Sequence, residues 1–350
     1  MSFNELRKDY LLDRWVVIAT ERSRRPTDFA KKKREKVEAG NCPLCPGNEH
    51  MTPPAVLAYL KSDGNIKKVK DKDGFRHKNW LIRCVPNLYP AFTPPKKSDD
   101  KAKKVKREDL AVGHHEVLVE SPLHDDHPAD AKISQLIHVI HGYIDRLEIL
   151  SAKPYVKYVS IFRNHGREAG ASLSHAHSQI IATPFAPTIV KEELKASREF
   201  WGKNQKCFFC DILRKESKDP RMIQENKDYV AFTPWASVHP LEFWIVPRKH
   251  EANLLQTSQN RVRSFAKTLR MCMKGLKDLL GDPPYNFGFH LAIDEDAYRH
   301  YHWHLEVYPK LSVWAGFEKS TGTYINTVSP EVAAESLREA ILSQSEDDRI

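Results

Sequence analysis

The sequence lacks long apolar runs. None of its 350 residues lies in a stretch approaching 18 uninterrupted apolar residues, the length that indicates a membrane-spanning helix. The first eight residues, MSFNELRK, contain neither an apolar core nor a signal-peptide cleavage site. We therefore expect a soluble, cytoplasmic protein with no membrane partner. With 41% hydrophobic and 29% charged residues, the composition predicts a folded chain with a sizeable core and excludes a disordered one.

Acidic residues are scarce in one segment only. Between Lys31 and Arg107 there are 20 Lys or Arg against 8 Asp or Glu, so this segment carries +12, although the whole chain carries +9. Its Lys-rich stretches, Lys67–Lys72 and Lys96–Arg107, contain few aromatic side chains on which bases could stack. We interpret them as solvated loops, and we expect no nucleic-acid partner. A zinc-stabilised nucleic-acid-binding protein remains the remote alternative.

Cysteine is also rare, yet four of the six cysteines form two Cys-x-x-Cys pairs, Cys42/Cys45 and Cys207/Cys210. In a cytosolic chain of this length, such pairs indicate metal ligation before disulfides. A redox site is the alternative, and the presence of two pairs in similar contexts weakens it. The other two, Cys84 and Cys272, are expected in the core.

The two cysteine pairs open two similar series of features. Each pair is followed by a short apolar run, a histidine, a helical pattern, a β-like run and a His-x-His. The first series is Cys42/Cys45, 116–119, His124, 133–147, 155–162 and His175/His177; the second is Cys207/Cys210, 243–246, His250, 262–279, 285–292 and His302/His304. The offset from His124 to His175 is 51 residues and that from His250 to His302 is 52. The chain is therefore predicted to be built twice, with halves at 1–190 and 191–350 and the Lys-rich segment inserted in the first.

Each half supplies two thiolates and two histidines, which is a tetrahedral ligand set for zinc. A site with four protein ligands has no open position for water or substrate, so we expect both zinc ions to be structural. Single histidines are more simply explained as hydrogen-bonded side chains, but the duplication favours ligands. The expected sites are Cys42, Cys45, His124 and His175, and Cys207, Cys210, His250 and His302.

The segment His175–Gln179 (HAHSQ) carries the clearest sign of chemistry. If it is extended, residues two apart share a face, so His175, His177 and Gln179 form one polar row. The metal ligand His175 would then fix the backbone beside His177, whose neutral imidazole can attack phosphorus. Gln179 could donate an amide hydrogen bond to a phosphoryl oxygen. An exposed polar strand face is the plainer alternative.

These motifs resemble those of the galactose-1-phosphate uridylyltransferases, within the histidine-triad superfamily. The resemblance covers nearly the whole chain and rests on segments 22–26 (RSRRP), 42–45 (CPLC), 86–91 (PNLYPA), 121–124 (SPLH), 162–166 (FRNHG), 175–179 (HAHSQ) and 324–326 (YIN). It implies an α+β fold of two histidine-triad-like halves, with a mostly antiparallel sheet and flanking helices. It also implies a homodimer that acts on a nucleotide sugar and a sugar 1-phosphate.

Carried over position by position, the resemblance implies that His177 is the nucleophile and that Gln179 holds the phosphoryl oxygens. Asn87 then resembles a nucleoside contact and Glu318 a hexose contact. The residues that resemble phosphate contacts are Arg22, Arg25, Asn164 and Ser172.

Three departures bring the sequence closer to a plant-type branch that handles ADP-glucose. Leu88 and Tyr89 follow Asn87 where the uridylyltransferases have Asp, and the Cys207/Cys210 pair is expected to replace a Glu/His-rich second site. Residues 313–315 (VWA), directly before residues 316–318, lack the Lys that the family has there. The leading hypothesis is uridylyl transfer from UDP-glucose to galactose 1-phosphate through a covalent intermediate. The runner-up is an ADP-glucose phosphorylase or a dinucleoside polyphosphate adenylyltransferase.

Overall fold

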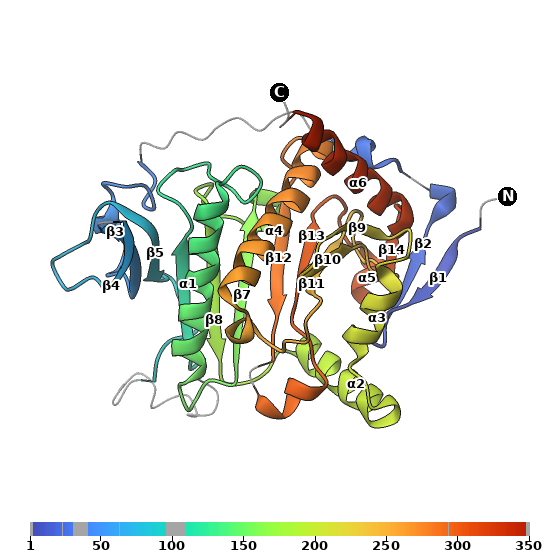
Figure 1. Cartoon of the computed structure of the whole chain (residues 1–350), viewed down its shortest axis with the longest axis horizontal. Helices are drawn as coiled ribbons and strands as arrows, with labels where there is room; N and C mark the ends of the chain where they lie inside the picture. The colour runs from blue at the N-terminus through green and yellow to red at the C-terminus, as the bar shows by residue number, and fades with distance from the viewer. Residues whose placement is uncertain are drawn as a thin grey trace.

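The computed structural model describes residues 3–22, 24–30, 41–62, 64–95, 110–292 and 294–347. It contains a large sheet covered by helices and a small sheet at one end (Figure 1). The Lys-rich stretch Lys96–Arg107 lies outside the described residues. In the part of the chain described, no helix is both long and apolar enough to cross a membrane.

The large sheet has eleven strands in the order β4-β3-β5-β6-β8-β7-β12-β13-β11-β10-β9. All neighbouring strands in it are antiparallel, as the resemblance implied. The strands are β3 (Leu57–Ser62), β4 (Asn65–Val69), β5 (Trp80–Pro86), β6 (His114–Val119), β7 (Tyr158–His165), β8 (His177–Thr183), β9 (Met222–Glu225), β10 (Tyr229–Phe232), β11 (Phe243–Pro247), β12 (Tyr285–His290) and β13 (His304–Pro309).

The strand order repeats about the pairing of β7 with β12. On one side the order outward is β7, β8, β6, and on the other it is β12, β13, β11. Each β-like run expected from the sequence forms one of these strands, and the two His-x-His segments stand at the starts of β8 and β13. The duplicated α+β architecture is therefore confirmed, whereas the division at residue 190 stays a prediction.

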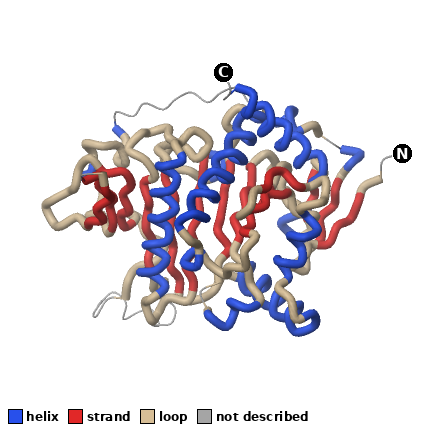
Figure 2. The backbone as a smooth tube through the Cα atoms, in the orientation of Figure 1, coloured by secondary structure: helices blue, strands red, loops and turns tan. Residues whose placement is uncertain are grey.

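Helices α1 (Ile133–Ser151) and α4 (Gln259–Leu280) lie side by side on one face of the large sheet (Figures 1 and 2). Apolar residues recur along both at helical spacing, so each helix buries one stripe. Leu136, Leu147 and Leu269 meet the strand residues Ile161 and Phe287 in one core cluster. These two helices are the helical patterns expected from the sequence.

The small sheet pairs β1 (Glu5–Lys8) antiparallel to β2 (Trp15–Ile18), and β2 parallel to β14 (Tyr324–Asn326). It joins the amino-terminal segment to the carboxy-terminal part of the chain. The remaining helices are α2 (Thr188–Asn204), α3 (Phe208–Glu216), α5 (Gly316–Thr321) and α6 (Pro330–Asp347).

One Lys-rich stretch differs from its prediction. Lys67–Lys72 was expected to be a loop, but Lys67 and Lys68 belong to β4, the edge strand that pairs with β3. Their side chains are exposed. Lysine on an edge strand opposes pairing with another chain, which explains how a charged run can occupy a strand.

Candidate active site and metal centres

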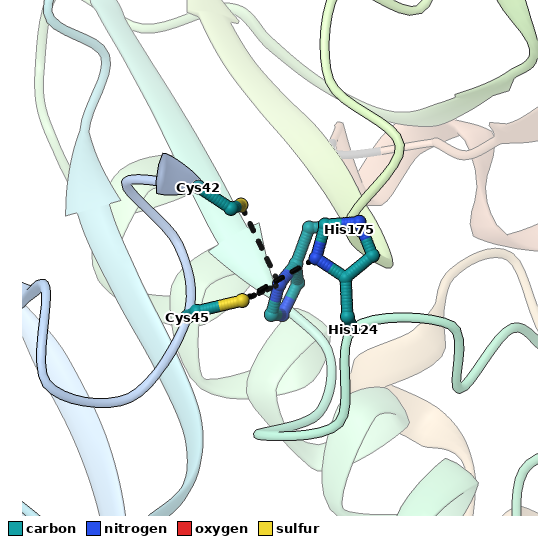
Figure 3. A group of neighbouring side chains, drawn as sticks. All are labelled: Cys42, Cys45, His124 and His175. Atoms are coloured by element: carbon teal, nitrogen blue, oxygen red, sulfur yellow. Dashed lines mark hydrogen bonds between the residues drawn. The ribbon is translucent and has the colours of Figure 1, made fainter. Parts of the chain in front are cut away.

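The first expected metal ligand set comes together at the start of β8. Cys42 and Cys45 lie on one loop and point toward the rings of His124 and His175 (Figure 3). Cys45 Sγ is 3.3 Å from His124 Nδ1 and 3.4 Å from His175 Nδ1, while Cys42 Sγ is 3.8 Å from His175 Nδ1. Zinc bond lengths and tetrahedral angles require about 3.6 Å between sulfur and nitrogen ligands, so the four side chains fit zinc.

The second ligand set has the same arrangement in the other half. Cys210 Sγ is 3.4 Å from His250 Nδ1 and 3.7 Å from His302 Nδ1, and Cys207 completes the group. Cys207 stands directly before α3, so the helix start presents both thiols. Both sets therefore contain the residues expected from the sequence and are consistent with zinc.

The far nitrogens of three of these histidines are held by oxygen atoms. His175 Nε2 is 2.9 Å from the Ser121 carbonyl, His124 Nε2 is 2.8 Å from Ser174 Oγ, and His250 Nε2 is 2.7 Å from the Tyr298 carbonyl. A carbonyl accepts a hydrogen from Nε2, which leaves the Nδ1 lone pair for a metal. The rings of His175 and His250, whose partners are carbonyls, are thus held in the tautomer that ligation needs.

His177 begins β8 and is only 6% exposed. Its Nδ1 donates to the backbone carbonyl of His175, at 2.7 Å. Burial lowers the pKa of His177, so the ring is neutral near pH 7. With the hydrogen on Nδ1, the lone pair lies on Nε2. The carbonyl of His175, a candidate metal ligand, therefore also sets the tautomer of His177 and leaves its Nε2 lone pair available to attack an electrophile.

The backbone around His177 is held from the helix side of the sheet. Ser178, the next residue, donates to Glu120 Oε1, and the hydroxyl of Tyr143 in α1 shares its single hydrogen between Ser178 Oγ at 2.6 Å and Glu120 Oε1 at 3.1 Å. Arg163 of β7 donates to Glu120 Oε2 and, at 3.3 Å, to the carbonyl of His177. Burial alone would lower the pKa of Arg163, but the Glu120 carboxylate raises it. A charged pair therefore lies directly beneath His177.

The opposite face of the sheet collects the other expected polar groups. Ser178 points to α1, so His177 and Gln179, its neighbours in the strand, point to the other face. Phe162 lies opposite Gln179 across the β7–β8 pair, which places Asn164 on that same face. Gly288 of β12 lies opposite Phe162, and a Cβ added there would meet no atom within 4 Å, so this face is open beside Phe162. A ligand approaching here meets His177, Gln179 and Asn164 together.

His115 of β6, which was not among the residues expected from the sequence, joins this face to the loop that carries Asn87. Its Nε2 is 2.7 Å from Gln179 Oε1 and 3.1 Å from Asn87 Nδ2. A histidine beside another histidine in a strand carries no motif, so nothing in the sequence singled it out. Arg163 and Glu120 were missed for the same reason, because their pairing spans 43 residues.

Four residues expected to contact the substrate have no hydrogen bond or ion pair to His177 among the described residues. Ser172 is exposed in the loop between β7 and β8. Arg22 ends a short 3-10 helix after β2 and Arg25 precedes another, while Glu318 lies in α5, beside β14. Within the described ranges, no hydrogen bond or ion pair links any of them to His177 or Gln179. Their contact with substrate stays a prediction.

The second half repeats the His-x-His but not a free nucleophile. His304, the counterpart of His177, is 0% exposed, and its Nε2 is 3.2 Å from Glu306 Oε1. Glu193 of α2 contacts His290 at 2.9 Å and lies 3.9 Å from His304. Although burial opposes it, Glu193 and Glu306 raise the pKa of His290 to about 9, so a cation neutralises part of this cluster. His304 Nε2, the nitrogen equivalent to His177 Nε2, is thus engaged by the Glu306 carboxylate.

This Glu/His cluster corrects one expectation. The Cys207/Cys210 pair was expected to replace a Glu/His-rich second site, but the structure contains both groups within the second half. The cluster draws Glu193 from α2 and His290 from β12, which no local sequence pattern connects.

Comparisons with known proteins agree with this architecture. The profile of a family described as a domain of unknown function (DUF4921) matches residues 97–350. ADP-glucose phosphorylase of Arabidopsis thaliana is 31% identical over 346 residues, covering 97% of this chain and 93% of the relative. Galactose-1-phosphate uridylyltransferase of Thermotoga maritima is 29% identical over 345 residues, covering 96% and 98%.

Among solved structures, the Arabidopsis thaliana ADP-glucose phosphorylase with bound ADP-glucose aligns with a TM-score of 0.79 and 28% identity, covering 96% of this chain and 99% of that one. The similarity extends over both halves of this chain. The chain belongs to the family that includes ADP-glucose phosphorylase and the galactose-1-phosphate uridylyltransferases.

Proposed function

We propose that this enzyme transfers a nucleotidyl group from a nucleotide sugar to a phosphate-bearing acceptor through a covalent intermediate on His177. The observation that carries the proposal is the hydrogen bond from His177 Nδ1 to the His175 carbonyl, which leaves Nε2 as the free nucleophile. Gln179 and Asn164 share its face and offer amide groups to the phosphoryl oxygens.

In the first step, the Nε2 lone pair forms a bond to the α-phosphorus while the bond from that phosphorus to the bridging oxygen breaks. The sugar 1-phosphate leaves with the bond's electron pair, and as a stable anion it needs no proton from the enzyme. The His177 ring gains positive charge, which its Nδ1–H shares with the His175 carbonyl. In the second step, an acceptor oxygen bonds to phosphorus and the N–P bond breaks, which restores the neutral ring.

The two zinc sites hold the framework and take no part in these steps. Zinc bound by Cys42, Cys45, His124 and His175 would fix the loop that carries the His175 carbonyl. The second set would do the same for the start of β13.

ADP-glucose is the donor that we favour, with inorganic phosphate as acceptor. Support comes from the Arabidopsis thaliana relative, whose name states this activity, and from the loop after β5. There Leu88 and Tyr89 are 60% and 85% exposed, so they offer apolar surface to a purine. The second candidate is the uridylyl transfer from UDP-glucose to galactose 1-phosphate expected from the sequence, which the Thermotoga maritima relative supports.

Isotope exchange tests the covalent step. With ADP-glucose and labelled glucose 1-phosphate but no acceptor, a covalent intermediate predicts label entering ADP-glucose, and His177→Asn should abolish the exchange while keeping its metal content. UDP-glucose in a parallel assay identifies the base. Turnover without exchange, or exchange that survives His177→Asn, would contradict the proposal.

A further inference from the structure

We infer that His115 is a positioning residue that orients the amide of Gln179 and couples it to the loop after β5. The inference rests on the proposed function, since it assigns Gln179 a hydrogen bond to the transferred phosphoryl group. Gln179 must present its N–H groups, and not its carbonyl, to a phosphoryl oxygen. An amide on an open face can turn either way, so something has to fix it.

The contacts of His115 determine which nitrogen carries its hydrogen. The backbone N–H of Ala91 donates to His115 Nδ1, at 3.1 Å, so Nδ1 holds a lone pair. A neutral ring then carries its hydrogen on Nε2. This N–H points at Gln179 Oε1, 2.7 Å away. The Gln179 oxygen is therefore engaged toward β6, which turns its NH₂ away from His115 and leaves that group free to donate.

The same ring anchors the loop expected to contact the nucleoside. Ala91 is bound through Nδ1, and the backbone N–H of Asn87 donates to the His115 carbonyl at 2.8 Å. The Asn87 side-chain oxygen accepts from the backbone of Tyr89, at 2.9 Å. With the hydrogen on Nε2, the Asn87 amide nitrogen 3.1 Å away lies beside the ring without a hydrogen bond to it, so the loop is held through Ala91 and the backbone. One imidazole thus holds both the loop and the phosphate-facing amide.

The backbone places His115 where both contacts can form. Gly113 lies so close to β8 that a Cβ added there would stand 2.1 Å from the Ala182 carbonyl oxygen. Any other residue would push the start of β6 outward. His115 and Gln179 also share one face of the β6–β8 pair, because Val117 lies opposite Gln179. Their contact is the diagonal one between neighbouring strands.

Two substitutions separate the two hydrogen bonds of the His115 ring, the one at Nδ1 and the one at Nε2. In His115→Asn, the shorter amide reaches the Nδ1 position, so its oxygen can still accept from Ala91, while the donor to Gln179 is lost. In His115→Gln, the longer amide reaches the Nε2 position and keeps that donor, while the Ala91 contact is lost. Removing one oriented donor from a developing oxyanion costs on the order of 10²-fold in kcat.

The test compares kcat and KM for ADP-glucose phosphorolysis, or for UDP-glucose if that substrate labels the wild type. His115→Asn should lower kcat about as far as Gln179→Ala does, with KM within about threefold of wild type. Combining the two changes should lower kcat no further than either alone. His115→Gln should instead raise KM several-fold and retain most of kcat.

The readouts distinguish this inference from the proposed function. If the wild type forms no nucleotidyl adduct, the proposed function fails. If the adduct forms but His115→Asn keeps kcat within twofold of wild type, the inference about His115 is wrong. If the fold-losses of kcat in His115→Asn and Gln179→Ala multiply in the double variant, the inference is also wrong, because the two side chains would then act independently. If His115→Asn does not fold, the kcat and KM of His115→Gln still test the inference.

Discussion

The buried pair Glu120–Arg163 allows a prediction whose magnitude can be worked out from its contacts. The side chains are 3% and 1% exposed, and the carboxylate is shared between separate partners. Oε1 accepts from the hydroxyls of Ser178 and Tyr143, whereas the contact that Oε2 makes is to Arg163. Arg163→Met would therefore leave a buried carboxylate oxygen uncompensated, which costs about 3–5 kcal/mol of unfolding free energy.

Urea unfolding of the zinc-loaded protein, followed by tryptophan fluorescence, measures this loss. Arg248→Met is the matched control, because Arg248 also pairs with a glutamate, Glu225, but the two side chains are 35% and 40% exposed. Such a surface pair contributes at most about 1 kcal/mol. The double variant Arg163→Met/Glu120→Gln should lose less unfolding free energy than the sum of the losses in the two single variants, since both substitutions act on one contact. A loss of unfolding free energy in Arg163→Met no larger than that in Arg248→Met, or additive losses for Arg163→Met and Glu120→Gln, would contradict this prediction.

Three further outcomes are expected. Burial would raise the pKa of Asp71, but hydrogen bonds, led by the one from Arg83, lower it to about 2. Because this pKa is below the usual value of 3.8, the ionised Asp71 carboxylate stabilises the fold above pH 4. The stabilisation is lost as the pH falls toward 2. Asp71→Asn should therefore lower the free energy of unfolding by about 2 kcal/mol at neutral pH, and the variant and the wild type should become equally stable in acid. An equal loss of unfolding free energy at pH 2 would contradict the assignment. Elemental analysis should find one zinc fewer per chain in Cys42→Ser and in Cys207→Ser, and none in the double variant; two zinc ions in either single variant would exclude these ligands. Peptide mapping should find no nucleotidyl group on His304, whose Nε2 faces Glu306, and a label there would show that the second half is also reactive.

The sequence predicted the features that depend on local spacing. The Cys-x-x-Cys pairs and the matching offsets to His175 and His302 located both ligand sets, because each set is built from short motifs in a repeated order. The same repetition predicted two similar halves, which the strand order about β7 and β12 confirms. Alternation along a strand placed His177 and Gln179 together.

Contacts between distant strands could not be predicted in this way. His115 meets Gln179 only because β6 pairs with β8, and the register of that pair depends on turns and packing along the whole chain. Glu193 reaches His290 from a helix that no motif marks as part of a site. Lys67 and Lys68 were expected in a loop because charge dominated the local pattern, while pairing with β3 decided their structure.

The most direct measurement is the intact mass of the enzyme after brief mixing with ADP-glucose and, separately, with UDP-glucose. We expect a chain that gains one adenylyl or one uridylyl group, with the group mapped to the peptide containing His177, and no gain in mass in His177→Asn. ADP-glucose is expected to give the adduct. Release of sugar 1-phosphate at the full turnover rate with no mass gain at any mixing time, or an adduct that persists in His177→Asn, would contradict the account.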